Sequence, residues 1–83
     1  MKLLFTFNKF SDVFLCEKIG NGAGLSCLVT PVPRSLDVTC EYAVEIQDVD
    51  EKDVYAVLEL LKKNNLQYTR VFHSHQTTDG EVY

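Results

Sequence analysis

The chain has 83 residues, of which 46% are hydrophobic and 24% are charged, as in a small single-domain globular protein. Its 12 acidic and 8 basic side chains give a formal net charge of −4, and the basic ones form no stripe. This excludes nucleic acid as an expected ligand, because phosphate binding needs a cationic surface. No apolar run approaches the roughly 18–20 residues that span a bilayer. The apolar start is interrupted by Asn8, Lys9 and Asp12, too early for a signal peptide. We therefore expect a cytoplasmic protein with no membrane contact.

The first part of the chain predicts a strand, a helix and a second strand. Residues Lys2–Phe7 are strand formers and almost continuously apolar, which is typical of a central strand buried on both faces. Ser11 is the predicted N-cap of a helix that ends in the glycine-rich segment Gly20–Gly24. Leu25–Thr30 is the second predicted strand, in which successive side chains point to opposite faces. Cys27 then lies on the same face as Leu25 and Val29.

The second part predicts a strand, a helix and a last strand. Cys40–Gln47 is the third predicted strand, although its two faces are not distinguished by the pattern. A helix follows, with Asp50 as its N-cap and Asn64–Asn65 as its stop. Gln67–His73 is the fourth strand. The spacing i, i+3, i+4, i+7 predicts that the second helix faces the core with Val54, Val57, Leu58 and Leu61.

The order β-α-β-β-α-β predicts an α+β fold, a ferredoxin-like sandwich. In that fold a four-stranded antiparallel sheet carries two helices on one face, and the other face stays open for self-association or binding. We expect one domain over residues 1–73. Residues 74–83 are polar and aperiodic, and we expect a flexible C-terminal tail there.

Two short motifs resemble ligand sites but have simpler explanations. The glycines of "GNGAG" close a helix, whereas a dinucleotide-binding loop opens one, so they predict a turn. His73 and His75 could place two imidazoles on one side of an extended segment, but a metal site needs three or four converging ligands. We expect surface histidines, no metal and no organic cofactor.

The three cysteines are widely spaced and form no CxxC pair. An odd number with this spacing fits neither a disulfide framework nor a structural zinc site. Cys16 lies on the apolar side of the first helix and Cys27 on the apolar face of the second strand, so both are predicted to be inert core residues. Cys40 follows a loop that contains a cation, where a thiol can become reactive.

The segment "TPVPRSLDVTC", residues 30–40, holds both prolines of the chain. Each proline fixes φ and biases the residue before it toward an extended backbone, so the connection is stiff. It could hold a cation and a thiol in fixed relation, or it could only protect a sheet edge. The predicted site has Cys40 as the reacting thiol, and its binding residues are Pro31, Pro33, Arg34, Ser35 and Thr39.

These features together resemble a small bacterial and archaeal family of selenium/sulfur carrier-like proteins, over about Leu3 to Phe72. The resemblance includes the "FTF" strand, "EK" in the first helix, a Gly-x-Gly turn, and a loop of the pattern Pro-x-Pro-Arg-x-(Ile/Leu)-Ser-Ser-x-Cys-Gly. The loop positions that match are Pro31, Pro33, Arg34, Leu36 and Cys40.

The chain departs from the family pattern at three loop positions. Asp37 and Val38 stand where the family has paired serines, and Glu41 stands where it has glycine. Two added carboxylates beside the thiol are expected to raise the pKa of Cys40 and to weaken anion binding.

The resemblance implies a sulfur or selenium carrier, or a thiol-transfer accessory protein, more than a classical enzyme. Cys40 would take the chalcogen from a donor such as a cysteine desulfurase and pass it to an unknown acceptor, with Arg34 stabilising the anion. The alternative is a non-catalytic regulatory module of the same fold that binds a small molecule or a protein, with homodimerisation through the open face or the loop.

Overall fold

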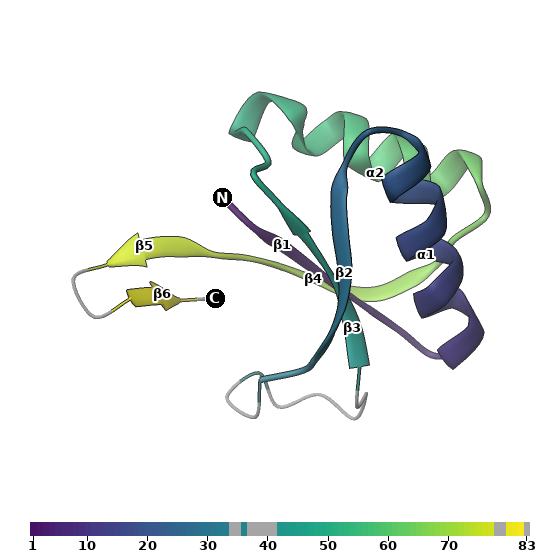
Figure 1. The fold of residues 1–83 in the computed structure, drawn as a ribbon, viewed down its shortest axis with the longest axis horizontal. Coiled ribbons are helices and arrows are strands. Elements are labelled where there is room, and N and C mark those ends of the chain that lie inside the picture. The colour runs from purple at the N-terminus through teal and green to yellow at the C-terminus, as the bar shows by residue number, and fades with distance from the viewer. Residues whose placement is uncertain (34–35, 37–41, 78–79, 83) are drawn as a thin grey trace.

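The computed structural model describes residues 1–33, 36, 42–77 and 80–82. Figure 1 shows a sheet with both helices packed on one side of it. The elements are β1 (Leu3–Phe7), α1 (Phe10–Gly22), β2 (Ser26–Pro31), β3 (Tyr42–Gln47), the 3₁₀ turn η2 (Glu51–Asp53), α2 (Val54–Lys63), β4 (Tyr68–His73), β5 (His75–Thr77) and β6 (Gly80–Val82).

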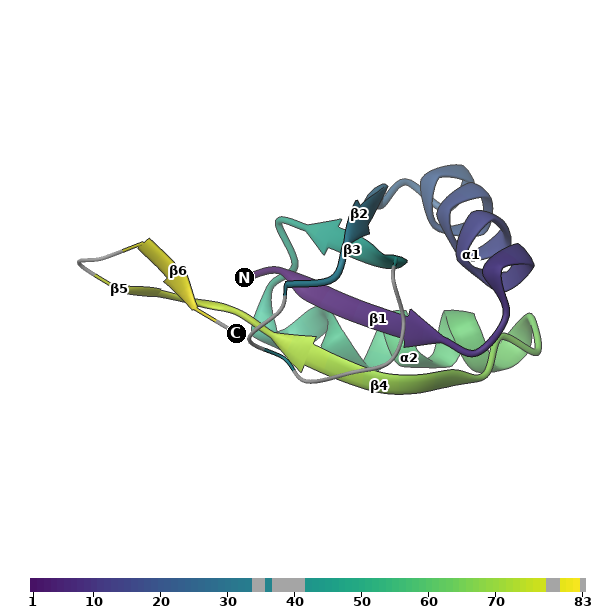
Figure 2. The same cartoon turned by 90° about the horizontal axis from the view of Figure 1, so that it is seen from below.

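The four long strands form one antiparallel sheet in the order β2-β3-β1-β4. Each helix connects two strands that are not neighbours, β1 to β2 and β3 to β4, so both crossovers return to the same face (Figure 2). This is the strand order and layering of a ferredoxin-like sandwich, and the predicted α+β fold is confirmed.

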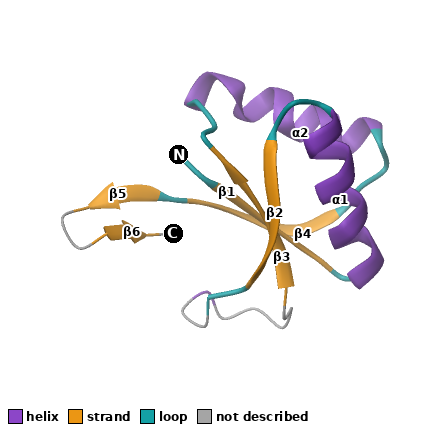
Figure 3. Ribbon diagram, in the orientation of Figure 1, coloured by secondary structure: helices purple, strands orange, loops and turns teal. Residues whose placement is uncertain are grey.

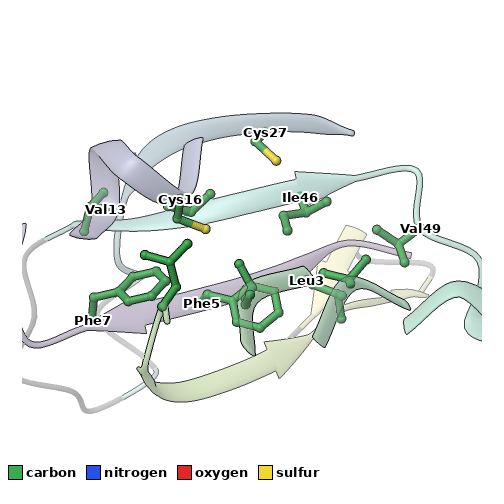
Figure 4. Close-up of a cluster of buried hydrophobic side chains, with 12 residues drawn as sticks. Leu3, Phe5, Phe7, Val13, Cys16, Cys27, Ile46 and Val49 are labelled. Carbon is green, nitrogen blue, oxygen red and sulfur yellow. The ribbon is translucent and has the colours of Figure 1, made fainter. Parts of the chain in front are cut away.

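β1 lies between β3 and β4, and all five of its residues are buried. Leu3, Phe5 and Phe7 alternate onto the helix side and belong to the main core cluster (Figure 4). Leu4 and Thr6 point to the opposite face, and each is no more than 1% exposed although neither α1 nor α2 covers that face. The prediction of a central strand buried on both faces is confirmed.

The core between helices and sheet uses the predicted helix faces. α2 contributes Val57 and Leu61 as buried residues, with Val54 and Leu58 packed against them, which confirms the predicted stripe. α1 contributes Val13 and Cys16. The other members of the cluster are Cys27, Val44, Ile46, Val49 and Leu66.

Both helices end in a Schellman motif, in which a left-handed residue turns the chain back. After α1, Gly24 has a φ of 88°, and the N–H of Leu25 donates to the carbonyl of Gly20 at 2.9 Å. After α2, Asn65 has a φ of 57°, and the N–H of Leu66 donates to the carbonyl of Leu61 at 2.9 Å. The predicted stops at Gly20–Gly24 and Asn64–Asn65 are confirmed.

The predicted helix starts differ from the structure. Ser11 lies inside α1, which begins at Phe10 after Lys9, so the predicted N-cap is wrong. Asp50 precedes the η2 turn and not α2 itself, and its side chain makes no capping hydrogen bond within the described part of the chain. A cap contributes only about 1 kcal/mol, so a capping residue alone does not determine where a helix begins.

The C-terminal residues include structure that the sequence pattern did not predict. β5 and β6 pair antiparallel as a separate two-stranded sheet, which extends from the end of β4 (Figure 3). The domain limit at residue 73 and the flexibility of residues 74–83 stay predictions. Within the described residues, no helix has the length and apolarity to cross a membrane.

Candidate functional site

The proline segment is a hairpin connection between two paired strands. Pro31 is the last residue of β2 and pairs with Tyr42, the first residue of β3. β2 is an edge strand, where the missing N–H of a proline is tolerated. The carbonyl of Pro33 accepts a hydrogen bond from the N–H of Leu36 at 3.1 Å. The predicted site residues Arg34, Ser35, Thr39 and Cys40, and the departures Asp37, Val38 and Glu41, lie outside the described residues.

The side of β2 that leads into this connection is tied to α1 by side chains. The carboxylate of Glu17 accepts the N–H of Val29 at 3.1 Å. The amide of Asn21 accepts the N–H of Cys27 at 2.9 Å and donates to the carbonyl of Cys27 at 3.1 Å. The side chain of Asn21 thus makes the two backbone hydrogen bonds that a neighbouring strand would make. The contacts between α1 and β2 extend to Val29, two residues before Pro31.

Three aromatic rings gather at the same end of the sheet. Phe10, the first residue of α1, makes an edge-to-face contact with Tyr42, with ring centroids 5.5 Å apart. Phe10 also contacts Phe14 one turn later, at 5.0 Å. The three side chains are 54%, 39% and 51% exposed in the order Phe10, Tyr42 and Phe14. We call these three residues the aromatic patch.

The two described cysteines are buried and have free thiols. Cys16 points from α1 toward the sheet, and Cys27 lies on the inner face of β2 (Figure 4). Burial raises the pKa of Cys16 to about 12, with a further increase from neighbouring Cys27. Burial also raises the pKa of Cys27 to about 11, with a contribution from the carboxylate of Glu17. At pH 7 only about one thiol in ten thousand or fewer is ionised at either site.

The histidines do not form part of a metal site within the residues that the structure describes. His73 is exposed at the end of β4, and His75 lies in β5. Across those residues, no group of three or more His, Cys, Asp and Glu side chains is arranged to hold a metal ion.

Sequence reasoning did not find the aromatic patch or the contacts of Glu17 and Asn21. The i, i+4 spacing of Phe10 and Phe14 is a visible signal for a helix face, but the predicted N-cap at Ser11 leaves Phe10 outside the helix. The contact of Glu17 with β2 follows from the return of the chain beside α1, which no local pattern encodes.

The fold and the connection define an α+β domain with a Pro-x-Pro hairpin at one end of its sheet. A protein family described as "Putative Se/S carrier protein-like" matches residues 2–73, and the chain belongs to this family. No curated protein and no solved structure matched the chain.

Proposed function

We propose that this protein carries sulfur or selenium as a persulfide or selenosulfide on Cys40. The observation that supports this choice of residue is the environment of the other two thiols. Cys16 and Cys27 are buried, and the raised pKa of each keeps it protonated at neutral pH. A thiol must ionise to react as a nucleophile, so Cys40 is the remaining candidate for the carrier chemistry that the family name suggests.

The transfer is a thiol exchange that needs no external oxidant. The thiolate of Cys40 attacks the terminal sulfur of a donor cysteine persulfide, and a new S–S bond forms on Cys40. The donor S–S bond breaks, and its electron pair leaves with the donor cysteine as a thiolate. The same exchange with an acceptor thiolate discharges the carrier. With selenium, the transferred atom is bound to Cys40 through an S–Se bond.

The N-terminus of α1 lies at the end of the sheet from which the hairpin connection leaves. Phe10, the first residue of α1, contacts Tyr42, the first residue of β3. Helix N-termini carry partial positive charge and lower the pKa of nearby thiols. Exposed Lys9 precedes the helix, and Arg34 follows Pro33 in the connection. The carboxylates of Asp37 and Glu41 act in the opposite direction, because negative charge raises the pKa of a nearby thiol.

Mass spectrometry of the loaded protein tests the proposal. Incubation with a cysteine desulfurase and cysteine is expected to add one sulfur atom, about 32 Da, and reductant should remove it. Cys40→Ser should take up no sulfur, whereas Cys16→Ala and Cys27→Ala should still be loaded. An adduct that persists in Cys40→Ser, or no adduct on the wild-type protein, contradicts the proposal.

Arg34→Ala separates the carrier from a binding module. In a carrier, loss of the guanidinium should slow the loading of Cys40, because the charge stabilises the thiolate and the persulfide anion. The measurement is the initial rate of sulfur uptake, with Lys62→Ala on α2 as the control for loss of one positive charge. Equal rates for Arg34→Ala and the wild type would exclude this role of Arg34.

A further inference from the structure

β4 lies at one border of the four-stranded sheet, and no described strand pairs with its outer side (Figure 2). The N–H of Ser74 donates to the carbonyl of Lys2 at 2.9 Å, on the side of β1. Because backbone groups alternate in direction along an antiparallel strand, Val71 and His73 direct their N–H and C=O groups outward. The pairing with β1 is irregular before residue 70, so the regular free edge is residues 70–73.

The two borders of the sheet differ in their protection. On β2, Pro31 has no N–H to offer, and side chains of α1 bond to the backbone of Cys27 and Val29. β4 contains no proline and no lysine, and its one charged residue is Arg70. Proteins protect edge strands with proline, charge or a covering element, because a bare edge pairs with other chains. β4 is therefore the edge that is suited to pairing.

The surface beside this edge is apolar and incompletely covered. Val71 is 39% exposed, and it lines a cavity of about 330 Å³ together with Val54 and Leu58 of α2. Tyr55 on the same helix is 72% exposed and lines a second cavity, of about 480 Å³, at the Tyr68 end of β4. Both cavities lie between β4 and α2, so a chain that pairs with β4 would run beside both of them.

We propose that β4 pairs antiparallel with β4 of a second copy of this chain, which joins the two sheets into one. The strand is complementary to itself. A two-fold axis at Phe72 sets Val71 of each copy opposite His73 of the other, and each such pair exchanges both of its N–H···O bonds. Arg70 does not stand opposite its own counterpart in this register, so no like charges oppose each other. The inference does not depend on the proposed carrier function.

The charges of α2 favour a second copy over an unrelated extended peptide. Glu51 lies at the His73 end of β4 and Lys62 at the Tyr68 end, so α2 runs antiparallel to β4. A two-fold axis across β4 therefore directs the acidic start of each α2 toward the basic end of the other, with Tyr55 between them along the helix. Such complementary charges fix the register of an interface. An unrelated peptide would supply the backbone hydrogen bonds without these charges.

Sedimentation equilibrium over a concentration series tests the proposed dimer. The wild type is expected at twice the 9.4 kDa of one chain. Val71→Lys should raise the Kd of the dimer at least about tenfold, because the two-fold axis places the added charge in the interface twice. Leu28→Lys is the matched control and should keep the wild-type Kd, since Leu28 is 37% exposed on β2, the opposite edge strand.

Val71→Pro tests the backbone part of the interface. The N–H of Val71 points away from β1, so a proline there keeps the pairing with β1 and should still dissociate the dimer. The amide of His73 should exchange slowly with deuterium in the wild type and faster in Val71→Lys. A wild type that stays monomeric up to about 1 mM, or equal Kd values for Val71→Lys and Leu28→Lys, would overturn the proposal. A dimer that persists in both variants of Val71 uses another surface and also overturns it.

Discussion

Gly20 and Gly22 lie in the same last turn of α1 but face different surroundings. A Cβ at Gly20 would overlap the sulfur of Cys27, whereas a Cβ at Gly22 meets nothing within 4 Å. Gly20→Ala should lower the free energy of unfolding by about 1–3 kcal/mol through overpacking. Gly22→Ala should raise it by about 0.5–1 kcal/mol, because alanine is the better helix former. Urea unfolding of both variants measures the two changes.

The Gly20→Ala/Cys27→Ala double variant checks the cause of the first change. If the overlap with the sulfur is responsible, removing that sulfur should recover part of the loss, so the two substitutions are not additive. Additive effects would mean that Gly20 is needed for another reason.

At the residue scale, the sequence predicts the backbone conformation of a residue better than it predicts which residues that residue contacts. The helix stop at Gly20–Gly24 was predictable because a left-handed C-terminal residue is a local property that glycine satisfies. The Ser11 N-cap was wrong because the N-cap of α1 is Lys9, two residues earlier, and Phe10, the first helical residue, contacts Tyr42. The contact of Gly20 with Cys27 depends on the return of β2, so no spacing rule could find it.

At the scale of elements, α1 protects the exposed edge of β2. An edge strand leaves backbone groups unpaired, and proteins cover such edges to prevent pairing with other chains. Asn21→Ala removes both hydrogen bonds to Cys27 and should lower the free energy of unfolding by about 1–3 kcal/mol. The amide of Cys27 should then exchange faster with deuterium, whereas the amide of Val44 in the interior of β3 should keep its rate relative to global unfolding.

Glu17→Gln is the matched control for this edge. Its side-chain oxygen can still accept the N–H of Val29, so exchange at Val29 should change little, whereas Glu17→Ala should speed it. If Asn21→Ala and Glu17→Ala leave both amides protected, the side chains of α1 do not hold the edge.

The elements that the sequence predicted well are those with a strong period or a buried run. β1 and α2 are examples, since one is apolar throughout and the other repeats its core positions over two turns. β5 and β6 were not predicted, because a strand of three mostly polar residues is too short to show the alternation of apolar and polar side chains that identifies a strand.

For the whole molecule, the order of the predicted elements was enough to predict the topology, whereas no motif was enough to predict the site. A β-α-β-β-α-β chain whose elements must bury hydrophobic faces against one another has few possible arrangements, and the strand order β2-β3-β1-β4 is one of them. Burial of Cys16 and Cys27 followed from their places on apolar faces. The exposed patch of Phe10, Phe14 and Tyr42 was not predictable, because exposure depends on how α1 and β3 meet.

Because of the two buried thiols, the stability of the whole fold should decrease at alkaline pH. Both thiols have an ordinary pKa of 9.0, which the fold raises to about 12 for Cys16 and about 11 for Cys27. Above pH 9 the unfolded chain releases protons that the folded chain retains, so the free energy of unfolding falls as the pH rises. The full contribution is present below pH 9. Both thiols contribute to the loss up to about pH 11, and Cys16 continues to about pH 12.

Urea unfolding under reducing conditions at pH 7, 8, 9 and 10 measures this loss. The slope from one thiol approaches about 1.4 kcal/mol per pH unit once it is ionised only in the unfolded chain. Cys16→Ala creates a cavity and lowers stability at every pH, but its slope above pH 9 should be shallower than that of the wild type. Equal slopes would show that Cys16 ionises alike in the folded and unfolded chains, which contradicts its burial between α1 and the sheet.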